Sequence, residues 1–242
     1  LACSPVSSPF LTSAWIAAWW RELAAGREPC VLCVWDGDDL AAAAALATRK
    51  ARYYGVPLRE WSWLGDRTSD RLGFLSRAGE REGLAALWSH LRARRNGCAI
   101  VRLEEVPDES PLIDVGRATW PGCEVEPSSP LPYVPVAGTW EAFELSLRKK
   151  FRTEIRTRVK VFDAWGDWRH EVREGLRALE LWDDMTRVEI ASHKAGLGTA
   201  FLAEAANAAF LRRFLAAPGA VVPVLLSLTV NGELAGYLLG FV

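Results

Sequence analysis

The sequence predicts an α+β fold in two related halves, with mixed sheets flanked by helices. Two segments, 31–46 and 225–242, share a pattern: an apolar strand, then Asp-Gly or Asn-Gly, an acidic residue, Leu-Ala and further apolar residues. Asp-Gly and Asn-Gly supply the positive φ that a two-residue hairpin turn requires. Similar hairpins roughly 195 residues apart indicate a duplicated unit. We expect the second copy to be truncated at Val242.

Length and composition limit the class of protein. The chain has 242 residues, of which 50% are hydrophobic and 24% charged, a profile that fits one large domain or two of ordinary size. The net charge of −1 provides no bulk attraction to polyanions, so we expect no nucleic-acid partner. The most apolar stretch, 215–230, contains two prolines, so we expect no membrane span. No secretory signal is visible, which predicts a cytoplasmic protein; the oligomeric state stays open.

The N-terminal domain is expected over residues 1–125. Thr12 or Ser13 is a suitable cap for a first helix, whose Trp residues place apolar bulk on one face. A helix ended by Asn96-Gly97 is expected later in this half, because these residues favour the left-handed conformation that stops helices. The predicted elements that follow the first helix are a hairpin over 31–48, a strand over 58–64, a helix over 80–95 and a strand over 98–103.

The C-terminal domain is expected over residues 126–242. Residues 119–139 are rich in Pro, Gly and Ser, a composition that favours an extended connection between domains. Thr139 starts a capping-box-like sequence at the beginning of a helix. The predicted elements are helices over 139–164, 174–194 and 200–215, followed by the second hairpin.

The cysteines and histidines do not predict a metal or redox site. Cys30 and Cys33 lie in a predicted strand, where residues three apart point to opposite faces, so we interpret them as buried structural thiols. A redox Cys-x-x-Cys pair would instead begin a helix. Only three His are present, at 90, 170 and 193, so we expect no metal site.

A strongly basic helix over 147–162 is the clearest chemical feature. Its apolar residues recur at helical spacing, at positions 151, 155, 159 and 162. Seven basic residues, at positions 148, 149, 150, 152, 156, 158 and 160, cover most of the rest, and Glu154 is the one acidic residue among them. One interpretation is a cationic surface that binds phosphate or carboxylate groups, since Arg pairs with both. The other is a solvated outer face. Arg152 and Arg156, one turn apart beside the apolar stripe, are the best candidates for anion binding.

A second candidate lies in residues 181–198. At helical spacing, Trp182, Glu189 and His193 project within roughly 40° of one another. A carboxylate one turn from an imidazole is suited to a general base, with Glu189 tuning His193. The alternative is an ion pair at a helix edge beside a half-buried Trp. Lys194 is a further candidate for anion binding, and the glycines after it resemble a helix stop more than a phosphate loop.

Several segments resemble a known family. Residues 8–20, 64–75 and 106–112 are similar to segments of the CelD-like acetyltransferases, which are often associated with cellulose biosynthesis. The basic residues 147–158 resemble that family's basic helix. Residues 191–199 resemble its helix-end segment, in which a Trp commonly occupies the place of His193. The likeness extends over nearly the whole chain.

The resemblance implies two tandem GNAT-like folds, related to the Fem-type peptidyltransferases, and acyl transfer from acetyl-CoA or another acyl-CoA to an amine. GNAT enzymes carry an Arg/Gln-x-x-Gly-x-Gly/Ala pyrophosphate loop after the strand that follows this hairpin. Residues 65–70 lack that spacing, and the second hairpin ends the chain. We therefore expect no CoA site in the first half, and the cofactor contacts of the second half to lie beyond Val242.

Together these observations predict an N-acyltransferase whose acceptor is an amine of a small molecule or polymer. The predicted role is in exopolysaccharide or cell-envelope biosynthesis. The expected catalytic residues are Glu189 and His193. The expected substrate or anion contacts are Arg152, Arg156, Lys194 and Trp182. Two alternatives remain: a non-catalytic scaffold module in polysaccharide assembly, and a Fem-like transferase that uses aminoacyl-tRNA.

Overall fold

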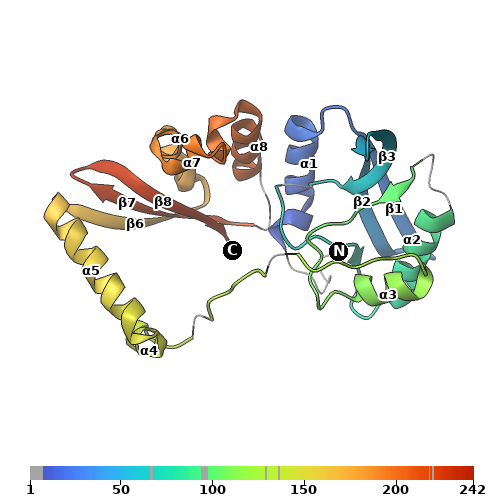
Figure 1. Cartoon of the computed structure of the whole chain (residues 1–242), viewed down its shortest axis with the longest axis horizontal. Helices are drawn as coiled ribbons and strands as arrows, with labels where there is room; N and C mark the ends of the chain where they lie inside the picture. The colour runs from blue at the N-terminus through green and yellow to red at the C-terminus, as the bar shows by residue number, and fades with distance from the viewer. Residues whose placement is uncertain are drawn as a thin grey trace. The chain divides into compact units, whose positions relative to one another are not determined.

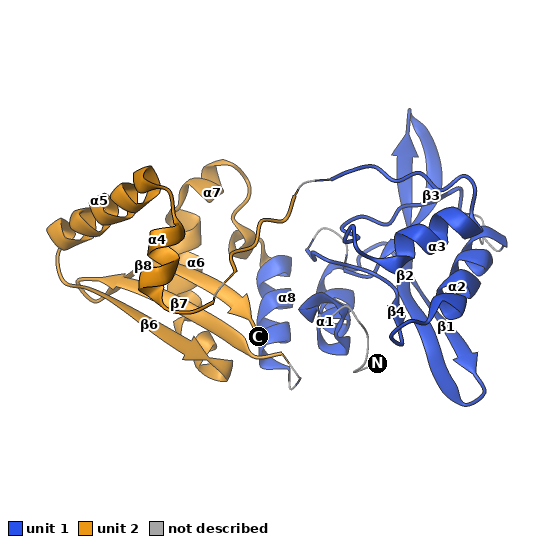
Figure 2. Cartoon of the chain, turned by 90° about the horizontal axis from the view of Figure 1, so that it is seen from below, with its two compact units in different colours: residues 1–128, 206–219 blue, residues 129–205, 220–242 orange. Residues whose placement is uncertain are grey.

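The computed structural model describes residues 8–65, 68–93, 98–128, 130–135, 137–217, 219 and 221–242. It has an α+β architecture, as predicted. The chain divides into two compact units, shown in different colours in Figure 2. Unit 1 contains residues 1–128 and 206–219, and unit 2 contains residues 129–205 and 220–242. Each unit is described by itself.

Unit 1 contains a mixed sheet. Its strands are β1 (Glu28–Asp36), β2 (Asp39–Tyr53), β3 (Val56–Trp63), β4 (Leu75–Ser76) and β5 (Ile100–Val101). β1, β2 and β3 form an antiparallel meander, β5 pairs in parallel with β3, and β4 pairs with β2. The helices before residue 128 are η1 (Pro9–Leu11), α1 (Ser13–Leu23), α2 (Arg81–Ala93) and α3 (Pro111–Thr119).

Helices α2 and α3 cover one face of this sheet, and α1 lies on the other side (Figures 1 and 2). The covered face forms the main buried cluster, to which β3 contributes Trp61 and Trp63 and α2 contributes Leu84, Leu87 and Leu91. Full burial of such a side chain contributes roughly 1.5–3 kcal/mol. Five tryptophans, at positions 15, 19, 20, 61 and 63, are expected from their spacing to fill cores. Trp15, Trp19, Trp61 and Trp63 do so, each at most 3% exposed, whereas Trp20 is only partly buried.

Helix α8 (Ala205–Ala216) joins unit 1 although its sequence lies inside the predicted C-terminal domain. The rings of Phe210 and Phe214 each meet the Trp15 indole edge-on, with centroids 4.8 Å apart. Arg213 Nε also pairs with Glu22 Oε1 at 2.6 Å. These contacts join residues far apart in sequence, which explains why a boundary drawn from local composition at 125/126 does not include them.

Unit 2 is built around an antiparallel sheet in the order β6-β7-β8, formed by Trp168–Glu174, Pro223–Val230 and Glu233–Phe241. Its helical elements are α4 (Trp140–Ser146), α5 (Lys149–Trp165), η2 (Gly175–Leu181), α6 (Trp182–Ala191), α7 (His193–Gly196) and η3 (Phe201–Ala203). Segments η2 and α6 contact one face of the sheet. Helices α4 and α5 lie on the opposite side (Figure 1).

The two faces of the unit 2 sheet differ in burial. Leu225 and Ser227 of β7 are buried on the face that η2 and α6 contact. On the other face, Val172, Leu226 and Leu238 are direct neighbours across the three strands, and they are 52%, 39% and 67% exposed. The described residues of unit 2 therefore leave an apolar row on one face of the sheet.

Both predicted hairpins are confirmed, but the first turns at Gly37-Asp38 rather than at the predicted Asp36-Gly37, because Asp36 pairs with Asp39. The two hairpins share a structural detail. Strands β1–β2 and β7–β8 each turn through two residues, with positive φ at Gly37 in the first and at Asn231 and Gly232 in the second. The register then shifts so that one residue of the second strand has no cross-strand partner. That residue is Ala41 in β2 and Ala235 in β8, each directly after a Leu.

Several predicted helix boundaries are wrong. The helix predicted over 139–164 is broken between α4 and α5, because Leu147 and Arg148 adopt ψ values of 147° and 142°. The element predicted as one helix over 174–194 is η2, α6 and α7, preceded by the unpredicted strand β6. Helix α3 was also not predicted; Ser110 caps it and Pro111 begins it. The predicted stop at 96–97 lies outside the described residues.

None of the described helices is both long enough and apolar enough to cross a membrane.

Candidate functional site

The candidate site of unit 2 is centred on the Glu189 carboxylate, near the end of α6. Glu189 is only 6% exposed. Beside it, Met185 is buried one turn earlier on the same helix. The alternative interpretation, an ion pair at a helix edge, is therefore wrong for Glu189, whose side chain points into the fold.

Two backbone N–H groups bind this carboxylate. Phe201 N donates to Oε1 at 3.1 Å, and Leu202 N donates to Oε2 at 2.9 Å. Both donors belong to η3, where N–H groups of a first helical turn have no partner within the helix. Glu189 therefore caps η3 from another element and anchors the segment that connects α6 to η3.

Two side chains complete the site. The Tyr237 hydroxyl of β8 donates to Glu189 Oε2 at 3.3 Å. The Lys194 ammonium lies 3.8 Å from Oε1. Burial of the Tyr237 phenol, with the nearby Glu189 charge and hydrogen bond, raises its pKa well above the ordinary value. The Tyr237 phenol therefore stays protonated far above neutral pH and keeps its hydrogen bond to Glu189.

Each oxygen of Glu189 contacts one backbone N–H group and one side chain. A carboxylate held by fixed donors is well suited to positioning a segment, since it satisfies groups that would otherwise be buried without partners. A general base must instead reach the proton that it removes. The geometry thus favours a positioning role for Glu189.

His193 does not share a helix face with Glu189. Helix α6 ends at Ala191, because Ser192 adopts an extended conformation with ψ 167° and starts α7. The Ser192 hydroxyl accepts a hydrogen bond from Lys194 N at 3.2 Å. His193 is exposed, whereas Trp182 is 7% exposed and buried at the start of α6. The predicted alignment of Trp182, Glu189 and His193 is therefore wrong, and Lys194 is the predicted residue that reaches Glu189.

Arg152 and Arg156 lie on α5 and bind α4. Arg152 donates to the Leu145 carbonyl oxygen at 3.0 Å, and Arg156 pairs with Glu144 at 2.9 Å. Each guanidinium therefore stabilises the angle between the two helices. No described contact joins either residue to Glu189.

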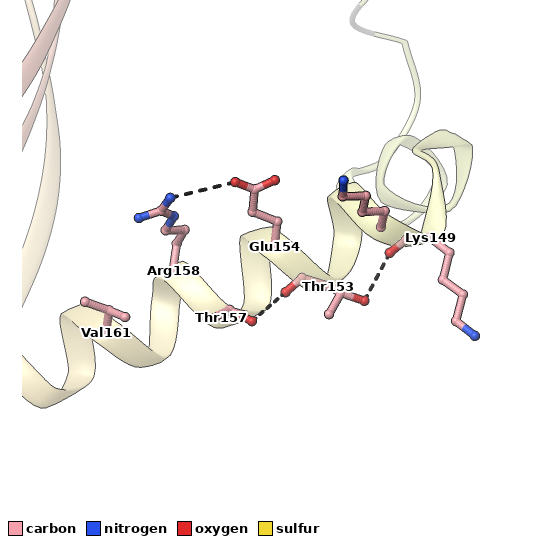
Figure 3. A pocket seen from close by; sticks show the side chains of 7 residues that line it. Lys149, Thr153, Glu154, Thr157, Arg158 and Val161 are labelled. Atoms are coloured by element: carbon pink, nitrogen blue, oxygen red, sulfur yellow. Dashed lines mark hydrogen bonds and ion pairs between the residues drawn. The ribbon is translucent and has the colours of Figure 1, made fainter.

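Another face of α5 forms a shallow, open depression (Figure 3). The Thr153 and Thr157 hydroxyls donate to the carbonyl oxygens one turn earlier, at 3.1 and 2.9 Å. Arg158 lies 3.8 Å from Glu154. The Lys149 ammonium projects away from these pairs in the same view. This surface presents cations to solvent without enclosing a ligand.

Unit 1 contains a buried carboxylate that the sequence did not indicate. Glu60 of β3 is fully buried and pairs with Arg49 opposite it on β2 and with the Tyr53 hydroxyl. Arg102 Nε lies 4.0 Å from its Oε2 and also donates to the Tyr53 hydroxyl at 3.0 Å. Because buried charges require partners, this cluster is a structural ion-pair network of the sheet.

The thiols agree only in part with the prediction. Cys30 is half-buried and Cys33 is exposed, on opposite faces of β1, so Cys33 is not a buried thiol. Burial raises the pKa of the Cys30, Cys98 and Cys123 thiols, which lowers their reactivity. The part of the chain that the structure describes contains no group of three or more His, Cys, Asp or Glu placed to hold a metal ion.

Sequence reasoning missed Tyr237 and the break at Ser192. Ser is a typical helix N-cap residue, so Ser192 before His193 and Lys194 was a usable indication of a new helix. No local sequence pattern indicated a role for Tyr237, since that role depends on β8 lying against α6.

Comparison of the chain with protein-family models, with curated proteins and with solved structures returned no match.

Proposed function

We propose that the protein is a GNAT-type N-acyltransferase built from two tandem GNAT-like units. It transfers an acetyl or other acyl group from acyl-CoA to an amine of a small molecule or polymer, in exopolysaccharide or cell-envelope biosynthesis. The proposal rests on the resemblance of residues 8–20, 64–75, 106–112, 147–158 and 191–199 to the CelD-like acetyltransferases.

The equivalent hairpins are the observation that supports the tandem arrangement best. In chain order a helix precedes each hairpin, α1 before β1–β2 and α8 before β7–β8, although α8 belongs to unit 1. Both hairpins have a two-residue turn, an acidic residue, Leu, and a bulged Ala. A bulge is a specific local device, so its recurrence at the same step of the same sequence pattern favours a common origin for the two hairpins.

The proposed chemistry is direct attack of an amine on a thioester. The amine nitrogen forms a bond to the acyl carbon, the carbon–sulfur bond breaks, and the proton lost by the amine ends on the thiol. A base accepts that proton during attack, and hydrogen-bond donors stabilise the oxyanion. We assign proton acceptance to His193, whose imidazole is exposed. Glu189 holds the segment that carries His193, and Arg152, Arg156, Lys194 and Trp182 remain the candidates for substrate or anion contacts.

Unit 1 does not fit CoA at the position of the GNAT pyrophosphate loop. After β3, a side chain at Gly65 would meet Ser69 Oγ at 2.9 Å, and that hydroxyl already accepts from Trp15 Nε1 at 2.7 Å. The described part of this loop is therefore filled by side chains. We assign no CoA contact to residues of this chain.

A scaffold role is the second candidate. It is favoured by the uncovered row of Val172, Leu226 and Leu238 on the unit 2 sheet. Exposed apolar surface of this kind is typical of protein interfaces.

The test is an acyl-transfer assay with the protein as its gene encodes it. Acetyl-CoA is mixed with a panel of amines, and release of free thiol is followed. We expect acceptor-dependent release that falls at least about 100-fold in His193→Ala, the lower end of the scale of lost general-base catalysis. The matched control is Arg187→Gln on the exposed side of α6, which should retain activity. Absence of thiol release with every acceptor, together with no acetyl-CoA binding by calorimetry, would contradict the transferase and favour the scaffold.

A further inference from the structure

Helix α5 has an apolar stripe that the described part of unit 2 does not bury. No residue of α5 is buried. Phe151, Ile155, Val159 and Phe162 fall within an arc of about 80° on the helix surface. Phe151 is 52% exposed and Val159 is 41% exposed, although both belong to the face that ordinarily packs against a core.

The remaining surface of α5 is strongly cationic. Residues 149–165 contain six Lys or Arg residues and two acidic residues, in a chain with a net charge of −1. Arg152 and Arg158 border the apolar stripe on its two sides, where long basic side chains can extend along the stripe toward a charged surface. The positive charge is thus concentrated on the element that also exposes apolar side chains.

Exposed aromatic and aliphatic residues continue along α4 and at the end of α5. Trp140 and Leu145 of α4 are 57% and 72% exposed, and Trp165 at the end of α5 is 59% exposed. Arg152 and Arg156 join the two helices through Leu145 and Glu144. Helices α4 and α5 therefore form a linked element with Trp near each end, a residue that favours the boundary between water and lipid.

We propose that α4–α5 binds the surface of an anionic phospholipid bilayer, with α5 lying in the plane of the headgroups. The stripe around Phe151 and Val159 enters the boundary between headgroups and acyl chains, and Arg152 and Arg158 at its two borders reach the lipid phosphates. The lysines on the opposite face add long-range attraction to the anionic surface. Charge complementarity favours this occupant, since a cationic helix with exposed aromatics and a charged opposite face is the composition of surface-bound helices. The helix does not span the bilayer.

The experiment is vesicle flotation with the full chain. Vesicles contain phosphatidylcholine alone or phosphatidylcholine with phosphatidylglycerol, at low and high salt. We expect binding only to the anionic vesicles, and weaker binding at high salt because ions screen exposed charges. Lys149→Gln with Lys150→Gln should lower the partition coefficient by more than about tenfold, since each surface charge contributes about fivefold. Phe151→Ser should also lower it, because apolar burial is the second source of affinity.

A matched control removes the same charge elsewhere. Arg52→Gln with Arg117→Gln changes two exposed basic residues of unit 1 and should leave binding within about twofold of the original. Circular dichroism and thermal unfolding confirm that each variant is folded. The proposal is wrong if anionic vesicles do not bind the chain, or if binding is unchanged in both α5 variants. Self-association or DNA binding that depends on Lys149 and Lys150, without vesicle binding, would assign the surface to a second copy or to nucleic acid instead.

Discussion

Ala41 and Ala235 hold the same position in two hairpins. Each is left without a cross-strand partner where the register shifts, directly after a Leu that pairs across the strands. A bulge of this kind bends the strand and increases its twist, so both hairpins leave their turns with the same local distortion. The two residues differ in surroundings, since Ala41 is 3% exposed and Ala235 is exposed. The hairpins therefore agree in the position of the bulge rather than in packing.

The turn of the second hairpin provides the first prediction. Asn231 has φ 53°, its Oδ1 accepts from Asp167 N at 3.0 Å, and its Nδ2 donates to the Trp165 carbonyl at 3.2 Å. Asn231→Gly removes both hydrogen bonds and should lower the free energy of unfolding by about 1–2 kcal/mol. Asn231→Ala should cost about 1 kcal/mol more, because a Cβ disfavours the left-handed conformation. Urea denaturation measures both, and an Ala variant as stable as the Gly variant would contradict the conformational argument.

The second prediction concerns Glu189. Glu189→Ala leaves the Phe201 and Leu202 amides without their acceptor, so we expect a loss of about 2–4 kcal/mol in the free energy of unfolding. Hydrogen exchange at those two amides should increase more than at amides of β7. Glu180→Ala removes a carboxylate that is 59% exposed and is the control, with an expected change within about 0.5 kcal/mol. Equal effects of the two substitutions would show that Glu189 does not anchor η3.

The third prediction is a pH dependence. The pKa of Tyr237 is raised in the folded state by burial and by Glu189, so at high pH the unfolded chain loses the phenol proton first. The folded state then holds more protons, and stability falls as pH increases. The contribution of Tyr237 is fully present below about pH 10, the value for an unperturbed Tyr, and is lost above it. Urea denaturation between pH 8 and pH 11 should show a smaller decline in Tyr237→Phe than in the original protein. Parallel declines would contradict the raised pKa of Tyr237 and therefore its burial beside Glu189.

The fourth prediction tests the packing of α2 against α3. A Cβ at Gly116 would lie 2.9 Å from two ring atoms of Trp88, whose Nε1 donates to the Leu112 carbonyl at 3.1 Å. Gly116→Ala should therefore destabilise unit 1 by about 1–3 kcal/mol, the usual cost of overpacking. Gly73→Ala is the control, since nothing lies within 4 Å of the added Cβ. Thermal unfolding compares the two, and a stable Gly116→Ala variant would show that α3 moves away from Trp88 at little cost.

Elements with local chemical causes were predictable from the sequence. Thr12 and Thr139 cap α1 and α4 through their own side chains, as predicted, because a cap depends on residues within one turn. The turns at 37–38 and 231–232 require positive φ, which Gly and Asn adopt readily. By contrast, the residue types at Leu147 and Arg148 did not indicate the break between α4 and α5.

Strand β6 and the surroundings of Glu189 were not predictable in this way. Trp168–Glu174 is mostly charged and lacks an apolar alternation, and it is a strand because β7 provides a ladder 50 or more residues later in the chain. Glu189 was chosen as a candidate from its type and spacing alone. Its burial and its contact with Tyr237 depend on η3 and β8, which follow it at a distance in sequence.

The sequence by itself determined the α+β class, the two hairpin turns and the starts of α1 and α4, because these depend on backbone preferences and hydrogen bonds within a few residues. Only the tertiary structure decided that α8 packs on Trp15, that Glu189 caps η3, and that the stripe of α5 stays exposed. Burial and pairing between distant segments set these features, and no local pattern encodes which segment will supply the partner.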